Sequence, residues 1–190
     1  MLFRSAAVAD WSQITAGSWL KATLERLRHP ETIDACQPGR DLQATLRPYQ
    51  VEGVRWLWFM TELGLGGCLA DDMGLGKTIQ VIDLLLLRKR RLIASDPKRT
   101  PSLLVVPASL IGNWRQELAR FGPTLRVFFA HRSECSAEEL DCIAKNPATA
   151  LADVDLVVTT YGLARRQEWL QKPRWPLIVL DEAQDRKSVV

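Results

Sequence analysis

The sequence predicts an α/β fold in which a mostly parallel sheet is flanked by helices. Short apolar stretches alternate with amphipathic stretches of helical length from Leu46 onward. This alternation is typical of right-handed βαβ units. Hydrophobic residues make up 47% and charged residues 25% of the 190 residues, which is the composition of a globular protein. The length is enough for one ordinary domain, or for one domain and part of another.

The predicted elements follow one another along the chain. Trp19–Leu27 has helical spacing and stops before Pro30, and Gln37–Asp41 has the composition of a linker. Pro48 suits the first turn of a helix that runs to about Leu63. The later helices are expected over Lys77–Arg91, over Leu110–Phe121 with Ser109 as its cap, and from the capping box Ser136–Glu139 to Lys145. Strands are expected over Gly67–Ala70, Leu103–Val106, Arg126–Ala130, Leu156–Thr159 and Leu177–Leu180.

Composition also excludes several classes of protein. No apolar run reaches the roughly 18 residues of a membrane span, and Met1–Leu20 lacks the apolar core of a secretory signal. We therefore expect no membrane partner. The net charge of +3 is too small to indicate nucleic acid by itself. The four cysteines form no C-x-x-C pair and have no His at ligand spacing, so we expect reduced thiols rather than a zinc site.

A glycine-rich turn comes directly before the helix expected at Lys77. Its sequence is Asp71-Asp72-Met73-Gly74-Leu75-Gly76-Lys77-Thr78. Gly74 and Gly76 allow backbone N–H groups to turn inward around an anion. Lys77 can place a charge on terminal phosphates, and Thr78 offers a hydroxyl to Mg²⁺. Asp71 stands where the strict phosphate-loop pattern has glycine, so the alternative is a glycine turn that happens to precede a Lys-Thr helix start.

Two carboxylates, Asp181 and Glu182, follow the expected strand Leu177–Leu180. Carboxylates at the end of an apolar strand are unfavourable unless they are exposed or paired. A Mg²⁺ ion held between Thr78 and Asp181 would pair them, and Glu182 could then orient an attacking water. Such an acidic pair by itself is usually a solvated loop. Together with the phosphate loop it predicts the second half of a nucleotide site.

These motifs resemble those of the Swi/Snf-type ATP-dependent DNA translocases, which are helicase-like proteins with two RecA-like lobes. The similarity extends from Leu46 to Gln184. The matching segments, in family order, are Leu46–Gln50 with Gly53, Trp56 and Leu57, Ala70–Thr78, Leu104–Leu110 with Asn113, Trp114 and Glu117, Val157–Gly162, and Asp181–Gln184. Asp71 is usual in this family, and Gln184 stands where His is commoner, as it often does in bacterial members. The resemblance implies a P-loop NTPase fold, the first RecA-like lobe of a bacterial protein.

The resemblance also implies roles for individual residues. The residues expected to bind ATP are Gln50, Asp72, Gly74, Leu75, Gly76, Lys77 and Thr78, and Gln50 would read the adenine edge through its amide. Lys77, Asp181 and Glu182 would be catalytic, and Thr78 and Asp181 would hold Mg²⁺. The residues expected on the DNA backbone are Pro107, Ser109, Thr159, Thr160 and Tyr161. Backbone contacts suit a protein that must follow any sequence, because they carry no base information.

The function implied by the resemblance belongs to a longer parent protein. It would hydrolyse ATP with Mg²⁺, translocate along double-stranded DNA and remodel the complex of that DNA with a protein of unknown identity. We expect it in the bacterial cytoplasm, associated with the nucleoid. Two alternatives stay open: a nucleotide-binding or DNA-binding module without turnover, and an RNA-acting helicase. The chain alone is expected to be inactive, and either monomeric or prone to aggregate.

Three segments are expected along the chain. Residues 1–44 would be the end of an upstream region plus a linker, 45–184 an incomplete first RecA-like lobe, and 185–190 a non-native tail. Met1–Ser5 and Asp185–Val190 correspond to translations of paired short-read sequencing adapters, so the native part would be Ala6–Gln184. Other codons at these positions in the nucleotide sequence would contradict this expectation.

Two basic runs and a tryptophan pair have alternative interpretations. Arg88–Arg91 is either a DNA-binding patch or, as we prefer, a set of cations that offsets a helix C-terminus. Arg165 and Arg166 follow one of the expected DNA contacts and are candidates for a phosphate contact. Trp56 and Trp58 are expected in the core rather than in a stacking role.

Overall fold

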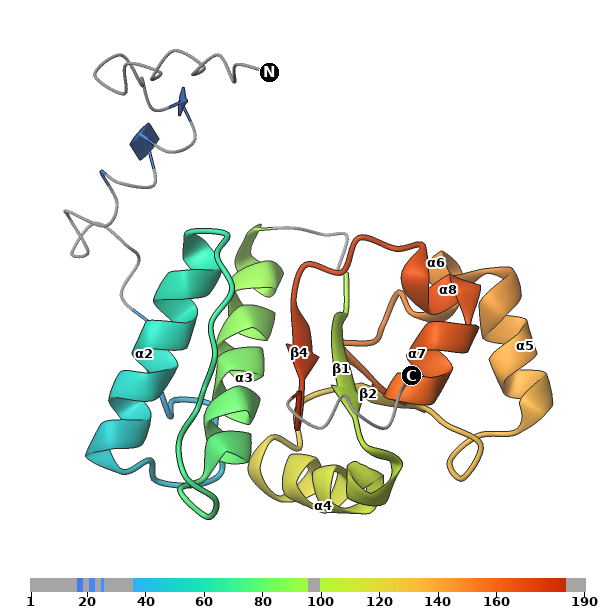
Figure 1. The fold of residues 1–190 in the computed structure, drawn as a ribbon, viewed down its shortest axis with the longest axis horizontal. Helices are drawn as coiled ribbons and strands as arrows, with labels where there is room; N and C mark the ends of the chain where they lie inside the picture. Colours follow the sequence, from blue (N-terminus) through green and yellow to red (C-terminus); the bar gives the residue numbers. More distant parts are fainter. Residues whose placement is uncertain (1–16, 19–20, 23–24, 26–35, 96–99, 184–190) are drawn as a thin grey trace, which may run out of the picture.

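Four parallel strands form the sheet in the computed structural model of the chain, in the order β2–β3–β1–β4 (Figure 1). They are β1 (Ser102–Val106), β2 (Val127–Ala130), β3 (Leu156–Thr160) and β4 (Ile178–Leu180). The structure describes residues 17–18, 21–22, 25, 36–95 and 100–183. All three strand pairings are parallel, so the carboxyl ends of the strands meet at one edge of the sheet. The predicted fold class is confirmed.

Helices cover both faces of this sheet. The longer ones are α2 (Pro48–Glu62), α3 (Lys77–Ser95), α4 (Ile111–Phe121) and α5 (Ala137–Lys145). The short ones are η3 (Ala108–Leu110), α6 (Pro147–Ala150), α7 (Tyr161–Arg166) and α8 (Glu168–Gln171). Successive side chains of a strand point to opposite faces, and β1 shows this clearly. Its Leu104 and Val106 pack against α3 and α4, and its Leu103 and Val105 pack into the core beneath α5 and α8.

Helix α2 lies outside α3, one layer further from the sheet (Figure 1). Its Val54 and Trp58 are buried against Leu84 and Leu87 of α3. The expectation that Trp58 belongs to the core is therefore confirmed. The same expectation is wrong for Trp56, which is 40% exposed.

Two helix starts follow the sequence, and one does not. Pro48 occupies the first turn of α2, and the Ser136–Glu139 capping box opens α5, with the Ser136 N–H donating to Glu139 Oε2 at 2.8 Å. The prediction that Ser109 caps the next helix is wrong, because α4 begins only at Ile111. A 3₁₀ turn intervenes, in which the Leu110 N–H donates to the Pro107 carbonyl at 3.0 Å.

The strand predicted over Gly67–Ala70 is not formed. Three glycines between Gly64 and Gly67 weaken any extended pairing in this segment, since glycine brings entropy and no side chain to a strand. The segment instead contacts α2: a Cβ built on Gly67 would lie 3.0 Å from the ring of Trp56. The Gly67 segment therefore covers part of the Trp56 ring, whose remainder is exposed.

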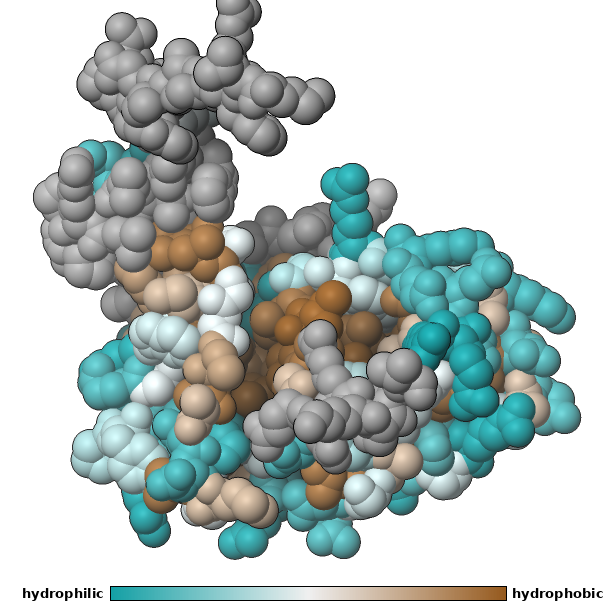
Figure 2. Space-filling view, in the orientation of Figure 1, coloured by the Kyte–Doolittle hydropathy of each residue, from teal (hydrophilic) through white to brown (hydrophobic). Residues whose placement is uncertain are grey.

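The outer edge of β4 is consequently open. Strand β4 pairs with β1 on one side, and no other strand of the described part of the chain pairs with it. Its Ile178 is 52% and its Leu180 40% exposed. Figure 2 shows apolar side chains gathered in the middle of this face, over β4 and the flank of α3. Open strand edges and apolar patches favour association, so the aggregation expected from the sequence stays a prediction with this physical basis.

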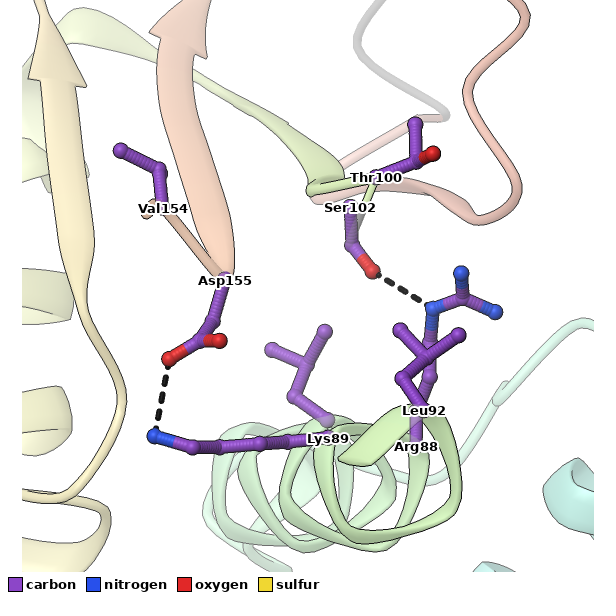
Figure 3. A pocket seen from close by; sticks show the side chains of 8 residues that line it. Arg88, Lys89, Leu92, Thr100, Ser102, Val154 and Asp155 are labelled. Atoms are coloured by element: carbon purple, nitrogen blue, oxygen red, sulfur yellow. Dashed lines mark hydrogen bonds and ion pairs between the residues drawn. The ribbon is translucent and has the colours of Figure 1, made fainter. Parts of the chain in front are cut away.

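The basic run Arg88–Arg91 does not end a helix, because α3 continues to Ser95. Each of its four side chains contacts another part of the chain. The contacts are Arg88 Nε to Ser102 Oγ at 3.1 Å, Lys89 to Asp155 at 2.8 Å, Arg90 to Asp41 at 3.2 Å, and Arg91 to Glu62. Figure 3 shows the first two around a small hollow between α3 and the starts of β1 and β3. The run therefore links α3 to β1, to Asp155 before β3, to Asp41 and to α2. Neither a DNA-binding patch nor a set of cations at a helix C-terminus describes these contacts.

Asp83 of α3 is a buried carboxyl, only 1% exposed, that accepts the Gly39 N–H on Oδ2 at 2.8 Å. Burial raises its pKa from 3.8 to about 6, although the Gly39 N–H and the Arg90 charge act in the opposite direction. The folded protein therefore holds this proton more tightly than the unfolded chain does. The stability that follows is present below the unfolded pKa and is lost as the pH rises from about 4 to about 6.

Asp83→Asn should therefore be more stable than the wild type at pH 7, because it removes a buried charge and keeps an oxygen for the Gly39 N–H. At pH 4 the two proteins should unfold at the same urea concentration, since the wild-type carboxyl is then protonated in the folded state. Asp141→Asn, an exposed change on α5, is the control. An advantage of Asp83→Asn that is equal at both pH values would contradict the assignment.

Several predictions concern residues outside those that the structure describes. They are most of the helix Trp19–Leu27, the two terminal segments Met1–Ser5 and Asp185–Val190, and Gln184. The four cysteines are free, as expected. In the described part of the chain, no helix combines the length and the apolar character that crossing a membrane requires.

Candidate nucleotide-binding site

The glycine-rich turn forms a loop that enters the N-terminus of α3. Gly74 and Gly76 have φ values of +84° and +76°, a left-handed conformation that side chains disfavour. The Lys77 ammonium donates to the backbone carbonyls of Asp71 at 2.6 Å and Asp72 at 3.1 Å, so it is held across the loop. The first N–H groups of the 19-residue helix α3 point towards the same place. The loop therefore has the charge and the donors that a phosphate chain requires.

Two side chains of α2 fasten this loop. The Leu75 carbonyl accepts from Tyr49 Oη at 3.1 Å and from Gln50 Nε2 at 3.0 Å. Gln50 is 7% exposed, and its Oε1 accepts the Arg47 N–H at 2.9 Å. A Cβ built on Gly76 would lie 2.5 Å from Gln50 Nε2 and would displace this amide, and the φ of +76° at Gly76 also favours glycine.

Gln50 thus lies beside the phosphate loop. Both ends of the Gln50 amide already form hydrogen bonds within the chain: Oε1 accepts at the start of α2, and Nε2 donates to the Leu75 carbonyl. To bind adenine, Gln50 would have to give up one of these two hydrogen bonds for a bond to the base. Its role in adenine recognition stays a prediction. Tyr49 had no assigned role in the sequence, although its place next to Gln50 on the first turn of α2 was the available signal.

Asp71, the residue that departs from the strict phosphate-loop pattern, also has a partner. Gln80 of α3 is 1% exposed, and its Nε2 lies 3.3 Å from Asp71 Oδ2 and 3.4 Å from the Gly76 carbonyl. Gln80 lies one helical turn beyond Gly76, so a single buried amide ties the two ends of the loop together. An aspartate at this position accepts a bond that glycine could not.

A second polar group surrounds Asp181, directly after β4. Its backbone N–H donates to the Val105 carbonyl of β1 at 2.9 Å, and its carbonyl accepts from Tyr161 Oη at 2.7 Å. The side-chain Oδ2 accepts from Trp114 Nε1 at 2.7 Å, and Oδ1 accepts the Glu182 N–H at 3.0 Å. Both backbone groups and both carboxylate oxygens of Asp181 therefore have partners, which fixes the direction of its carboxylate.

Glu182 has an unusual backbone. Its φ of 50° places it in the left-handed region, a conformation that costs an ordinary residue about 1–2 kcal/mol. Strained residues gather at functional sites, where the surrounding structure maintains them. The role of Glu182 on an attacking water stays a prediction.

The five residues expected on the DNA backbone do not all lie at the surface. Ser109 is exposed, and Pro107 begins the η3 turn at the carboxyl end of β1. Thr160 accepts the Leu163 N–H at 3.4 Å as the N-cap of α7, whose first residue is Tyr161. Thr159 is fully buried, and its hydroxyl donates to the Ala130 carbonyl at 3.1 Å. The prediction that Thr159 contacts DNA is therefore wrong in this structure, because its side chain joins β3 to β2.

The predicted nucleotide-site residues thus lie in two groups, one around Leu75 and one around Asp181. The donor types fit magnesium and a triphosphate: loop N–H groups and Lys77 suit phosphate, and the Thr78 hydroxyl and the Asp181 carboxylate are the hard oxygen ligands of Mg²⁺. Each Asp181 oxygen accepts one N–H and keeps a lone pair for a further partner. A shared ion between Thr78 and Asp181 stays a prediction. Among the described residues, no three His, Cys, Asp or Glu side chains form a separate metal cluster.

Three features together define the class of protein. A phosphate loop lies at a helix N-terminus, an acidic pair follows strand β4, and a parallel sheet has helices on both faces. The chain is therefore a P-loop protein with a RecA-like fold. The chain also matches the family described as the SNF2-related domain over residues 49–189. It therefore belongs to the SNF2-related domain family.

Individual relatives agree with this assignment. The chain is 37% identical over 177 residues to the "Putative ATP-dependent helicase/translocase YwqA" of Bacillus subtilis. The matched region is 93% of this chain and 18% of that protein. It is 40% identical over 161 residues to the chromatin-remodeling ATPase INO80 of Cryptococcus neoformans, over 83% of this chain and 9% of that protein.

A solved structure is similar as well. The SWI2/SNF2 ATPase core of Sulfolobus solfataricus in complex with double-stranded DNA superposes with a TM-score of 0.63 at 36% identity, over 82% of this chain and 30% of that chain. The present chain thus spans less than a third of each of these relatives.

Proposed function

We propose that the chain is the ATP- and Mg²⁺-binding part of a DNA-dependent ATPase that moves along duplex DNA and remodels protein–DNA complexes. One observation carries the proposal furthest. Asp181 follows β4, the η3 turn with Ser109 follows β1, and Tyr161 follows Thr160, the last residue of β3. These three strands are neighbours, and their carboxyl ends lie at one edge. The candidate metal ligand and the candidate DNA contacts therefore share one edge of the sheet.

The chemistry of these residues suits phosphoryl transfer, in which a protein mainly positions water and neutralises charge. Lys77 would move its ammonium from the loop carbonyls onto the terminal phosphates. Thr78 and Asp181 would hold Mg²⁺, which neutralises charge on the phosphates. Glu182 would orient the attacking water. Ser109 and the first turn of α7 would face the phosphate backbone of DNA, where they give contact without sequence preference.

The relatives support the duplex as the substrate. The Sulfolobus ATPase core was solved with double-stranded DNA, and the names of the two protein relatives describe an ATP-dependent helicase/translocase and a chromatin-remodeling ATPase. The identity of the remodelled protein is open. We also propose that the bacterial parent protein acts at the nucleoid, within the cytoplasm.

The decisive experiment measures phosphate release by the full-length parent protein with no nucleic acid, with duplex DNA and with duplex RNA. We expect the duplex DNA to raise the rate most. Stimulation by RNA but not DNA would favour an RNA-acting helicase. Binding of ATP with no turnover under any condition would favour a nucleotide-binding module.

The 190-residue chain alone should hydrolyse ATP at background level, with no stimulation by DNA. In helicase-like proteins of this kind the arginine finger lies on a second lobe, and such a finger is worth about 10³–10⁵ in kcat in related NTPases. The measurement is phosphate release by a monomeric sample at several DNA concentrations. Clear DNA-stimulated turnover that Lys77→Ala abolishes would show instead that this chain suffices.

A further inference from the structure

Trp114 makes an unusual contact for a core side chain. It belongs to α4, is 3% exposed and packs among the apolar residues between α4 and the sheet. Its indole N–H leaves this core to donate to Asp181 Oδ2 at 2.7 Å. A buried indole N–H usually finds an acceptor, and here the acceptor is the carboxylate that the proposed function assigns to the metal.

Tyr161 reaches the same residue from the other side. It is the first residue of α7, and its hydroxyl donates to the Asp181 carbonyl at 2.7 Å. Trp114 and Tyr161 therefore hold one residue through two different groups, the carboxylate and the backbone carbonyl. Neither contact follows from sequence proximity, because the three residues lie on three separate elements.

Trp114 and Tyr161 lie on helices α4 and α7, which begin next to the turns at the carboxyl ends of β1 and β3. Helix α4 begins directly after the η3 turn, in which Ala108 and Ser109 are exposed. Helix α7 begins directly after the buried Thr160 at the end of β3. A shift of either turn would move Trp114 or Tyr161, and with it the orientation of the Asp181 carboxylate.

We propose that Trp114 and Tyr161 are positioning residues that orient Asp181 and connect the turns after β1 and β3 to the metal ligand. The inference rests on the proposed function, since it assigns the regulation of that same site. Duplex DNA that contacts the η3 turn or the first turn of α7 would thereby alter how well Asp181 faces Mg²⁺. Residues that orient a metal ligand typically change metal affinity or activity by 10–100-fold when they are replaced.

The chain offers a control for this inference that matches Trp114 in its hydrogen bond, although Trp175 is only partly buried. Trp175 also donates its indole N–H at 2.7 Å, but to the Leu170 carbonyl, on the face of the sheet with α8. Trp114→Phe and Trp175→Phe therefore each delete one indole hydrogen bond of equal length and shorten one ring system. Tyr161→Phe deletes only a hydroxyl and preserves the ring, so it remains informative even if Trp114→Phe unfolds.

The experiment measures two quantities in the full-length protein. The first is the free Mg²⁺ concentration that gives half-maximal ATP binding, measured by calorimetry. The second is the ratio of ATPase rates with and without duplex DNA. We expect Trp114→Phe to raise the Mg²⁺ midpoint by about 10–100-fold and Trp175→Phe to change neither quantity. Tyr161→Phe should raise the Mg²⁺ midpoint measured without DNA as well as shrink the stimulation ratio, because loss of a DNA contact alone would change only the ratio.

Different failures are separable. If Trp114→Phe and Tyr161→Phe both behave like Trp175→Phe while the wild type is stimulated by DNA, the two residues are structural only and the inference is overturned. If the wild type shows no DNA-stimulated turnover at all, the proposed function fails first. A Mg²⁺ midpoint that moves equally in Trp114→Phe and Trp175→Phe would indicate general destabilisation, which also overturns the inference.

Discussion

Replacing Lys77 by alanine in the full-length protein is expected to lower duplex-stimulated ATP hydrolysis by at least about 100- to 1,000-fold. The Lys77 ammonium lies across the phosphate loop, 2.6 Å from the Asp71 carbonyl and 3.1 Å from the Asp72 carbonyl. It is the lysine that this loop can direct to the terminal phosphates. Alanine leaves the charge that grows on the phosphate without this partner, at the point where a fixed cation matters most.

The measurement is phosphate release at saturating duplex DNA. Lys145→Ala is a suitable control, because Lys145 is an exposed lysine in the last turn of α5 and its loss changes the net charge equally. Glu182→Gln separates binding from turnover: we expect it to bind ATP and to hydrolyse it poorly. A Lys77→Ala protein that keeps a tenth or more of the wild-type rate would rule out this loop as the phosphate site.

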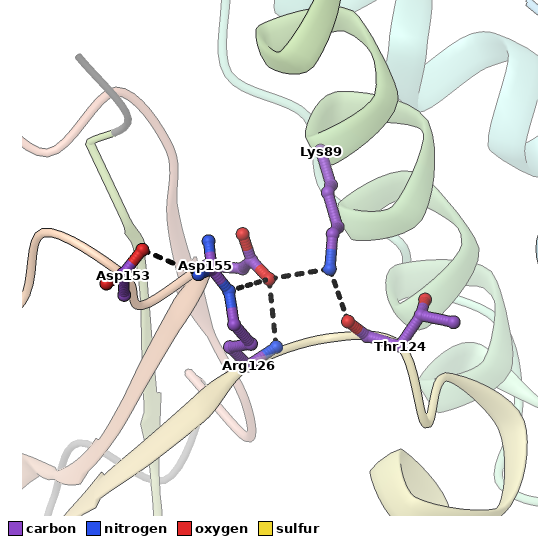
Figure 4. A network of polar contacts seen from close by, with 5 residues as sticks. All are labelled: Lys89, Thr124, Arg126, Asp153 and Asp155. Atoms are coloured by element: carbon purple, nitrogen blue, oxygen red, sulfur yellow. Dashed lines mark hydrogen bonds and ion pairs between the residues drawn. The ribbon is translucent and has the colours of Figure 1, made fainter. Parts of the chain in front are cut away.

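Replacing Asp155 by alanine is expected to lower the free energy of unfolding by about 3–5 kcal/mol, the usual result of breaking one side of a buried ion pair. Asp155 lies just before β3, and its side chain is 7% exposed. It pairs with Lys89 of α3 at 2.8 Å and accepts the Arg126 backbone N–H at 2.9 Å (Figure 4). Lys89 also donates to the Thr124 carbonyl. Alanine would leave the Lys89 charge, 17% exposed, without its counterion.

The control lies two residues away. Asp153 forms an ion pair with the same Arg126 at 2.7 Å, but its side chain is 93% exposed. Exposed pairs contribute about 0–1 kcal/mol, so Asp153→Ala should change urea unfolding little. Equal losses in the two variants would contradict the distinction between the buried and the exposed pair.

The loss in Asp155→Ala should also depend on pH. Burial favours the neutral carboxyl, but the bonds from Lys89 and Arg126 outweigh it and hold the pKa of Asp155 below its ordinary value. A depressed folded pKa contributes stability above the unfolded pKa, and this contribution disappears as the pH falls through the folded value. The difference between wild type and Asp155→Ala should therefore be large at pH 7 and shrink below about pH 4.

Much of the fold could be predicted from the sequence because its signals are local. Pro48 at a helix start, the Ser136–Glu139 capping box, and Gly74 and Gly76 in the phosphate loop act on residues within one or two turns of themselves. The apolar runs that became β1 to β4 likewise carry their preference within a few residues. These local signals determined the α/β class, the order of the elements and the position of the loop before α3.

Only the tertiary structure decided which distant residues meet. Thr159 was expected on the DNA backbone, but helices cover both faces of the sheet, and its buried hydroxyl donates to the Ala130 carbonyl of β2. The segment Gly67–Ala70 was expected to be a strand, but it forms none, and its Gly67 lies against Trp56. Trp114 meets Asp181 across 67 residues of sequence, and Lys89 meets Asp155 in the same way. Such pairs depend on strand order and helix packing, which arise from the sum of many weak burial terms and leave no signal at either residue alone.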